Sequence, residues 1–290
     1  MAKKLYGGTE IKPLETMMNR FVMDYSVDIT TAFNGLLDYI IGYFDPTGAP
    51  IEGWPFKQEQ NKRMHEMMYQ YIQIMDEQLA HKQWFDAWGD LFMALYANGA
   101  DKNQFFTPPS LVNMMTEVAM NNLGEPTHDV LGFGRRHIIN DPSCGSSRNL
   151  LAGHAKYLYL YEREPFLSGE DIDSLCCKMS AINMMMHGCF GEVVCHNTLA
   201  EPDKVRLGYI INETRYPIPS TLPSIRRSTN PAHFACTSAM FIIRRQNEVK
   251  RQSESKPAET PAETPKANTP TEERRPTSQL TLFDLWDTEN

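Results

Sequence analysis

The sequence has no long run of apolar residues. No uninterrupted hydrophobic stretch reaches the roughly 20 residues that a membrane-spanning helix needs. The opening MAKKLYGG also lacks the apolar segment found in secretory signals. We therefore expect a cytoplasmic protein without a membrane partner. The 290 residues suffice for one sizeable core with accessory segments, but not for two large domains.

Cysteine is scarce and poorly spaced for metal binding. The six cysteines include no pair with the CxxC or CxxH spacing of zinc sites. Cys176 and Cys177 are adjacent, which suits neither an ordinary disulfide nor a shared metal. We expect no metal site and interpret the cysteines as small apolar residues of a reduced core.

Basic residues are in deficit as well, because 28 lysines and arginines face 36 acidic residues. A net charge of -8 argues against a protein that binds nucleic acid through its whole surface. The segment 203–251 is the exception, with nine basic and three acidic residues. This segment is either a phosphate-binding surface or an ordinary solvated face.

Residues 1–100 are expected to form a helical N-terminal subdomain. Between Asn61 and Gln83, apolar residues recur three and four positions apart, and glycine and proline are absent. This spacing places the apolar side chains on one face of a helix. A methionine-rich face of this kind is more typical of a core than of a cofactor site.

In the segment 101–250, short apolar runs alternate with helical stretches. The first run is at His137–Asn140 and the fourth is at Leu207–Ile211. Strands and helices that alternate at this spacing predict an α/β fold with a parallel sheet. Open sheets of this type bind ligands outside the carboxyl ends of their strands.

A turn of small residues follows the first predicted strand, with the sequence Asp141-Pro-Ser-Cys-Gly145-Ser. Gly145 gives the backbone the freedom to approach a ligand closely at the start of a helix. Asp141 supplies a fixed charge that suits an ammonium group. Glycine turns are common, however, and a simpler interpretation is that Asp141 caps the next turn.

This turn resembles the D-P-x-C-G-S-G turn of adenine-N6 DNA methyltransferases, especially the modification subunits of type I restriction systems. Gln104–Pro108 is similar to their G-Q-F/Y-F/Y-T-P segment, and residues 169–188 are similar to their G-x-E/D-I-x…M-N-x-x-x-H-G stretch. The resemblance covers about residues 100–215. It implies a Rossmann-like, S-adenosylmethionine-dependent methyltransferase sheet.

The resemblance also implies S-adenosylmethionine as the cofactor and the residues that contact it. Phe106 and Thr107 would contact the methionine moiety. Asp171 would accept hydrogen bonds from the ribose hydroxyls, and Ile172 would lie against the adenine ring. The residues implied at the amino-acid part and at the exocyclic amine are Asp141, Cys144, Gly145, Ser146 and, for the amine, Asn197. Taken singly, the aspartates are equally well explained as helix caps.

The sequence departs from the family at the catalytic motif. The family has D/N-P-P-Y/F after its fourth strand, where the first side chain holds the amine of a flipped adenine and the aromatic ring stacks on the base. Asn212 stands at the first position and Tyr216 one place late, while both prolines are missing. We predict catalytic roles for these two residues and DNA contacts for the basic residues nearby, which are Arg215, Arg226 and Arg227.

The last part of the chain divides into a polar linker and a short apolar peptide. Residues 251–278 are rich in proline, glutamate, threonine and serine, which predicts a disordered linker. Residues 279–286 restore hydrophobicity, and their sequence QLTLF resembles the QLxLF peptide that binds bacterial sliding clamps. Docking would use the residues Gln279, Leu280, Leu282 and Phe283. The alternatives are a nonspecific apolar terminus and a helix that folds back on the body.

Three functions remain open at this point. The first is a DNA adenine-N6 methyltransferase recruited by the clamp, with base readout supplied by a separate specificity subunit. The second is a catalytically degenerate adaptor of a phage or mobile element that binds DNA and the clamp. The third is an RNA or protein methyltransferase.

Overall fold

The computed structural model describes residues 8–51, 53–96, 106–121, 123–126, 131, 134–199, 204–213, 222–237 and 239. The predicted linker, residues 251–278, and the predicted clamp-binding peptide, residues 279–286, lie outside the described residues. Within those residues, no helix is both long enough and apolar enough to cross a bilayer.

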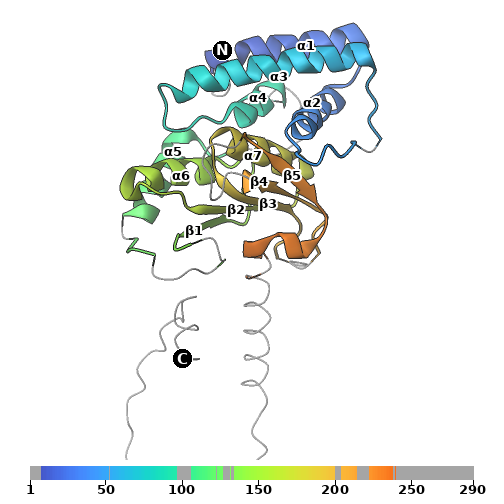
Figure 1. The fold of residues 1–290 in the computed structure, drawn as a ribbon. Helices are drawn as coiled ribbons and strands as arrows, with labels where there is room; N and C mark the ends of the chain where they lie inside the picture. Colours follow the sequence, from blue (N-terminus) through green and yellow to red (C-terminus); the bar gives the residue numbers. More distant parts are fainter. Residues whose placement is uncertain are drawn as a thin grey trace, which may run out of the picture. The chain divides into compact units, whose positions relative to one another are not determined.

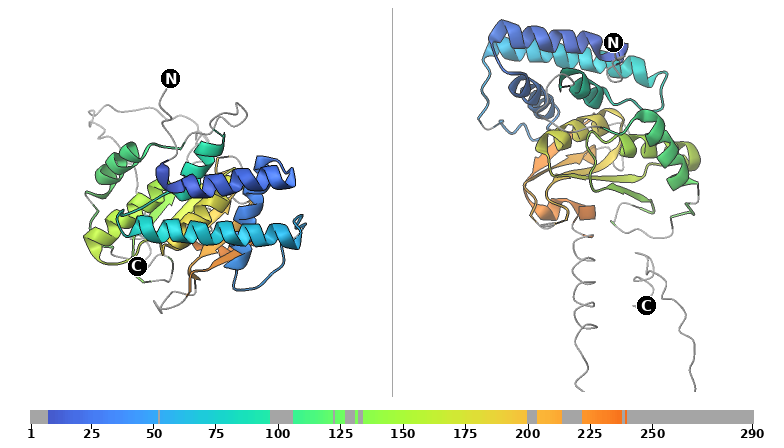
Figure 2. Two further views of the ribbon diagram at one scale, coloured as in Figure 1. Left: turned by 90° about the horizontal axis from the view of Figure 1, so that it is seen from above. Right: turned by 180° about the vertical axis from the view of Figure 1, so that it is seen from behind.

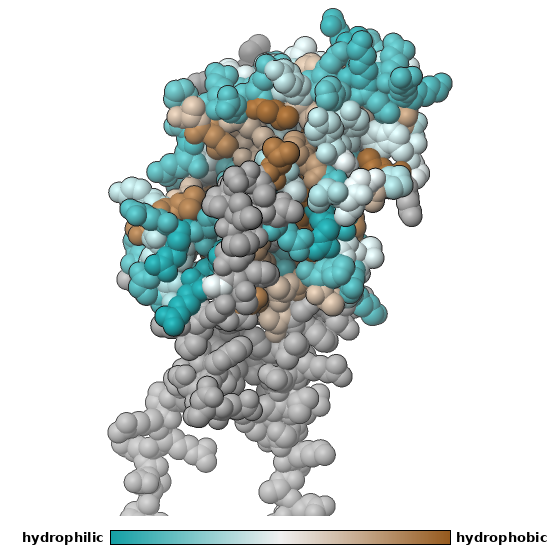
Figure 3. Space-filling view, in the orientation of Figure 1, coloured by the Kyte–Doolittle hydropathy of each residue, from teal (hydrophilic) through white to brown (hydrophobic). Residues whose placement is uncertain are grey.

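Helices make up the first part of the molecule (Figure 1). They are the short η1 (Thr9–Ile11), α1 (Lys12–Tyr25), α2 (Ile29–Tyr43), α3 (Gln58–Leu79) and α4 (Ala87–Tyr96). Asp28 caps α2, because its side chain accepts a hydrogen bond from the N–H of Thr31 at 2.9 Å. Trp88 is fully buried beside Phe33 and Tyr71, which joins α4 to α2 and α3. The long helices α1 and α3 form the outer surface of this layer, and Figure 3 shows that hydrophilic residues predominate there.

A five-stranded sheet forms the other side of the molecule. Its strands are β1 (Ile138–Asp141), β2 (Phe166–Asp171), β3 (Phe190–Cys195), β4 (Leu207–Ile211) and β5 (Ile225–Ser228). They lie side by side in sequence order. The first three are parallel, as predicted, whereas β4 and β5 are antiparallel to their neighbours.

The direction of β4 corrects the expectation of a wholly parallel sheet. Eleven residues separate Cys195 from Leu207. A parallel crossover needs roughly a dozen or more residues, usually with a helix, so this connection turns the chain back instead. In the doubly wound order 3-2-1-4-5-6 the first strand is central, but here β1 is an edge strand among the described residues.

Three more helices are α5 (Pro109–Met120), α6 (Arg148–Tyr161) and α7 (Ser174–Met186). Helix α7 lies between the sheet and the outer helices, whereas α6 packs on β1 and β2, and α5 packs on α6 at one side of the molecule (Figures 1 and 2). All residues of α7 from Leu175 to Met185 are buried, because it packs on β2, β3 and β4 and also on α2 and α4. A helix that is buried all round belongs to the centre of a fold. The six cysteines are buried and form no disulfide, as predicted for apolar core residues.

Candidate functional site

A cavity of about 290 Å³ lies where β1 and β2 end at their carboxyl termini. Six of the nine predicted cofactor residues line it, and they are Phe106, Thr107, Cys144, Gly145, Ser146 and Asp171. Segments far apart in the sequence thus meet at one place. The position agrees with the rule that α/β sheets bind ligands outside their carboxyl ends.

The turn at Gly145 gives this cavity its room. Gly145 has a φ of +54°, and a Cβ atom there would lie 2.8 Å from the ring of Phe106. Only glycine combines that torsion with the absence of a side chain. The neighbouring Ser147 also has a positive φ, of +76°, and its hydroxyl is hydrogen-bonded to the hydroxyl of Ser180. Ser147, at the last position of the turn that resembles D-P-x-C-G-S-G, therefore has a left-handed backbone.

Asp171 fixes the turn and keeps capacity for a ligand. Its Oδ2 accepts the N–H of Gly145 at 3.0 Å, and its Oδ1 accepts the N–H of Asp173 at 2.8 Å. Each carboxylate oxygen can accept one more hydrogen bond. Burial raises the pKa of Asp171, and the nearby Asp173 and Asp141 add to this effect.

The other three predicted cofactor residues are not among the residues that line the cavity. Asp141 accepts hydrogen bonds from the N–H of Ser143 at 3.1 Å and from Asn149 Nδ2 at 3.2 Å, so it caps the turn as the simpler interpretation held. Ile172, directly after β2, is 60% exposed and offers an apolar surface. Asn197, after β3, accepts the N–H of Leu199 at 3.2 Å.

Asp86, just before α4, is the main residue that sequence reasoning missed. This buried carboxylate accepts four hydrogen bonds, from Ser146 Oγ (2.5 Å), Arg148 Nε (2.5 Å), Asn183 Nδ2 (2.7 Å) and the N–H of Gly89 (2.7 Å). It therefore connects the turn at Gly145 to α4 and α7. The available signal was the acid-and-glycine sequence Asp-Ala-Trp-Gly-Asp at the start of an apolar helix. A Cβ atom at Gly89 would lie 2.0 Å from the Asp86 carboxylate, so the glycine permits the contact.

Arg148 extends this network to the second wall of the cavity. Besides Asp86, it donates to Asp90 Oδ1 at 2.6 Å and to the carbonyl oxygen of Thr107 at 3.1 Å. Burial, followed by the charge of Asp86, raises the pKa of Asp90 to about 6, although Arg148 opposes the shift. The arginine thus holds the Phe106–Thr107 segment against the turn.

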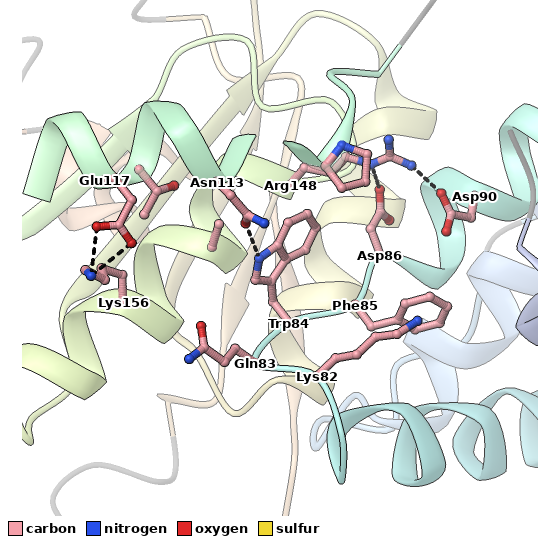
Figure 4. Close-up of a pocket in the computed structure, with 13 residues that line it drawn as sticks. Lys82, Gln83, Trp84, Phe85, Asp86, Asp90, Asn113, Glu117, Arg148 and Lys156 are labelled. Atoms are coloured by element: carbon pink, nitrogen blue, oxygen red, sulfur yellow. Dashed lines mark hydrogen bonds and ion pairs between the residues drawn. The ribbon is translucent and has the colours of Figure 1, made fainter. Parts of the chain in front are cut away.

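A larger cavity of about 510 Å³ lies on the other side of Arg148 (Figure 4). Several of its polar side chains contact one another. Trp84 Nε1 donates to Asn113 Oδ1 at 3.0 Å, and Lys156 pairs with Glu117 at 2.9 Å. Because these groups are already engaged, the cavity gives no indication of a specific ligand.

Asn212 lies at the opposite end of the sheet. Since β4 is antiparallel to β3, its last residue Ile211 pairs with Gly191 at the beginning of β3, far from the carboxyl ends of the parallel strands. Asn212 is completely buried, donates to the carbonyl oxygens of Met185 (3.2 Å) and Cys189 (2.7 Å), and accepts the N–H of Ser224 at 3.0 Å. These contacts give Asn212 a structural role, and its catalytic role stays a prediction.

Two of the three residues predicted to contact DNA are described by the structure, and both lie away from the cavity. Arg226 pairs with Glu213 at 2.9 Å, and Arg227 lies 3.8 Å from Asp45, both on the edge strand β5. The remaining predicted residues lie outside the described part of the chain. These are Arg215, Tyr216, Gln279, Leu280, Leu282 and Phe283.

The described residues contain no cluster of three or more histidine, cysteine, aspartate or glutamate side chains that could hold a metal ion. One buried acid–histidine pair lies on the other face of the sheet, where His196 Nε2 is 2.7 Å from Glu170 Oε2. Asn140 Nδ2 also donates to this carboxylate, at 3.0 Å. Against the effect of burial, the hydrogen bonds from His196 and Asn140 lower the pKa of Glu170. This pair links the ends of β1, β2 and β3 beside the cavity.

Residues 82–218 match the model of the N-6 DNA methylase family. The matched segment contains Asp86, the turn at Gly145 and all nine predicted cofactor residues. Among curated proteins, none matches the chain.

Two solved structures are similar. One, described as a class I S-adenosylmethionine-dependent methyltransferase from Listeria monocytogenes, is 12% identical over 66% of this chain and 54% of its own, with a TM-score of 0.42. The other, described as a modification subunit of a type I restriction enzyme from Vibrio vulnificus, is 18% identical over 51% of this chain and 30% of its own, with a TM-score of 0.31. The chain thus spans about half the length of the Listeria protein and under a third of the length of the Vibrio protein.

Proposed function

We propose that the chain binds S-adenosylmethionine in the cavity between Phe106 and Asp171 and takes part in adenine-N6 methylation of DNA. The premise is that the segment 82–218 belongs to the N-6 DNA methylase family, whose cofactor is S-adenosylmethionine. The single observation that carries the proposal is the turn at Gly145. Its positive φ and missing side chain open the cavity beside an acid with free acceptor capacity.

The residues present fit this cofactor. Phe106 and Thr107 would hold its methionine end, Asp171 its ribose and Ile172 its adenine ring. The turn also precedes α6, and backbone N–H groups at a helix start suit the carboxylate of the amino-acid part. When bound, S-adenosylmethionine supplies an activated methyl group. The protein's own contribution at this site is to bind and orient that group.

Two finer functions are compatible with this cofactor site. In the first, the chain is a DNA adenine-N6 methyltransferase in which Tyr216 stacks on the flipped base, Arg215, Arg226 and Arg227 contact the backbone, and a specificity subunit reads the sequence. In the second, it is a cofactor-binding module that does not transfer methyl groups itself. The buried, fully hydrogen-bonded Asn212 favours the second.

The C-terminal peptide adds a proposed partner, the bacterial sliding clamp. In this proposal, Gln279 supplies hydrogen bonds, and Leu280, Leu282 and Phe283 fill an apolar pocket. The linker of residues 251–278 would allow the body to reach nearby DNA. Fluorescence anisotropy of the labelled peptide 275–290 with purified clamp tests this directly. Replacement of both Leu282 and Phe283 by alanine should abolish binding, and equal binding by that variant contradicts the proposal.

Calorimetry with S-adenosylmethionine tests the cofactor proposal. The wild-type chain should bind, and Gly145→Val should weaken binding at least about 100-fold, because the new side chain meets the Phe106 ring. Gly124→Val is the matched control, since a Cβ atom there meets nothing within 4 Å. Absence of binding by the folded wild-type chain would rule the proposal out.

Transfer of labelled methyl groups to DNA then separates the two finer functions. Turnover by the purified chain supports an enzyme, and Tyr216→Ala should reduce it strongly. Cofactor binding without turnover on any DNA supports the module.

A further inference from the structure

Arg148 is a buried cation that lines both of the cavities described above. Its side chain is only 4% exposed. Among the described residues that line the cavity between Phe106 and Asp171, Arg148 carries the only positive charge and Asp171 the only negative charge. The two come from different segments, since Arg148 begins α6 and Asp171 ends β2. A polar ligand in this cavity therefore meets one group of each sign.

The guanidinium of Arg148 has more donors than the protein uses. It carries five N–H groups. The Nε group donates to Asp86 and the Nη2 atom to Asp90, the two carboxylates that Figure 4 shows beside it, and Nη1 donates to the carbonyl oxygen of Thr107. The described residues offer no further acceptor, so one N–H group remains on each terminal nitrogen. Buried donors normally have acceptors, which points to a ligand that supplies them.

These remaining donors are fixed in place before any ligand binds. Asp86, the main anchor of Arg148, is itself held by hydrogen bonds from Ser146 Oγ at 2.5 Å and from Asn183 Nδ2 at 2.7 Å. A planar guanidinium that is held in this way presents a rigid pair of donors, so little conformational entropy is lost when an acceptor binds. Such a fork matches the two oxygens of a carboxylate.

The position of Arg148 indicates which carboxylate it would bind. Its Nη1 atom lies 3.1 Å from the carbonyl oxygen of Thr107, and its Cζ atom lies 5.7 Å from the centre of the Phe106 ring. In the proposed function, Phe106 and Thr107 hold the methionine moiety, and the amino-acid part of that moiety carries a carboxylate. Arg148 is also the first residue of the 14-residue helix α6, where the helix dipole favours an anion.

We propose that Arg148 binds the carboxylate of the cofactor's methionine moiety through its two remaining N–H groups. This inference rests on the proposed function and deepens it, because it gives the cofactor a direction, with the carboxylate at Arg148 and the ribose at Asp171. The ammonium of the same amino-acid part offsets the ligand's carboxylate, so binding adds no net charge beside Asp86 and Asp90. A ligand without the carboxylate would leave buried N–H groups unpaired, and the site should discriminate against it.

Calorimetry of the full chain with two ligands tests the proposal. S-adenosylmethionine and decarboxylated S-adenosylmethionine differ only in the carboxylate. The wild type should bind the first about 10- to 100-fold more tightly, as expected for hydrogen bonds between charged groups. Arg148→Met should reduce this ratio to less than about 3-fold, mainly by weakening S-adenosylmethionine. A purely structural role would weaken both ligands alike, so an unchanged ratio in the variant overturns the proposal.

A second variant covers the case in which Arg148→Met does not fold, since that change leaves Asp86 and Asp90 without their cation. Arg148→Lys keeps the charge, but a single nitrogen cannot contact both carboxylates, the Thr107 carbonyl and a ligand at once. It should lower the ratio at least about threefold. Lys156→Met is the matched control, because Lys156 lines only the larger cavity and pairs with Glu117. A ratio that falls equally in Lys156→Met overturns the assignment to Arg148.

A crystal structure of the wild-type chain with S-adenosylhomocysteine tests the contact without any variant. A carboxylate oxygen within about 3.2 Å of a terminal nitrogen of Arg148 supports the proposal, and a carboxylate held elsewhere overturns it. The calorimetry also separates this inference from the proposed function. Equal binding of the two ligands by the wild type overturns the role of Arg148 and leaves the cofactor site standing, whereas binding of neither ligand overturns both.

Discussion

The two ends of the sheet each contain a residue with a φ of +54°, Gly145 at one end and Asn212 at the other. At the carboxyl ends of β1 and β2, the glycine uses this torsion to leave a cavity. At the opposite end, the asparagine uses it to fill space, with its amide bonded to three backbone groups. The same φ angle is therefore found beside a cavity, at what we call the binding end, and beside a filled core, at what we call the sealed end.

This contrast shows that the position of a residue after a strand indicates its location in the fold only when the direction of that strand is also known. Asn212 follows the fourth strand, where the resembling family carries its catalytic residue. Because β4 is antiparallel to β3, the end of that strand faces away from the cavity between Phe106 and Asp171. The predictions below test how separate the two ends are.

The largest effect is expected at the binding end, from Asp86→Ala. The change leaves the buried guanidinium of Arg148 without its main partner, which should lower the free energy of unfolding by about 3–5 kcal/mol. Urea denaturation measures this. Asp90→Ala is the control and should cost clearly less, because its side chain is 23% exposed and Arg148 keeps Asp86. A loss of less than about 1 kcal/mol for Asp86→Ala would show that the network does not hold the cavity walls.

The sealed end should be sensitive to acid through His187. Its Nε2 accepts the N–H of Phe85 at 3.0 Å, and its Nδ1 lies 2.7 Å from the carbonyl oxygen of Asn183, which together require a neutral ring. Burial lowers the pKa of His187 to about 4. Because the unfolded-state value is near 6.5, this contribution is complete above pH 6.5 and is lost as the pH falls towards 4.

The loss should reach at most about 3.5 kcal/mol between pH 6.5 and 4, since each pKa unit corresponds to roughly 1.4 kcal/mol. Denaturation at a series of pH values measures it against His187→Gln, which cannot be protonated in this range. A wild type and variant with parallel pH profiles would show that His187 titrates normally.

Six of the nine cofactor residues predicted from the sequence line one cavity at the binding end, whereas the direction of β4 at the sealed end was not predicted, and the difference has a physical reason. Phe106, the turn at Gly145 and Asp171 are recognisable because close approach to a ligand demands particular residues in short segments. Asp86 acts on the turn from 60 residues away, and only the packing of α4 on α7 brings it there. The direction of β4 depends on the length of a connection, not on the composition of the strand. Local rules identified the three parallel strands but gave no information on long-range contacts.

A moderate effect is expected from Asn212→Ala at the sealed end. Loss of its hydrogen bonds to Met185 and Cys189, with alanine in a left-handed conformation, should cost about 2–3 kcal/mol of stability. The affinity for S-adenosylmethionine, measured by calorimetry well below the melting temperature, should not change. A large loss of affinity with little loss of stability would mean that the two ends are coupled.

The smallest effect should come from Ile172→Ala, at the rim of the binding end. Ile172 is 60% exposed, so its truncation leaves no cavity in the core and should change stability by less than about 0.5 kcal/mol. If the adenine ring covers this side chain, the variant should bind S-adenosylmethionine about 5- to 10-fold more weakly, which corresponds to about 1 kcal/mol of apolar contact. Met23→Ala, equally apolar and exposed on α1, should bind as the wild type does. Unchanged affinity for Ile172→Ala would move the adenine ring away from the end of β2, while leaving the turn at Gly145 as the site of the methionine moiety.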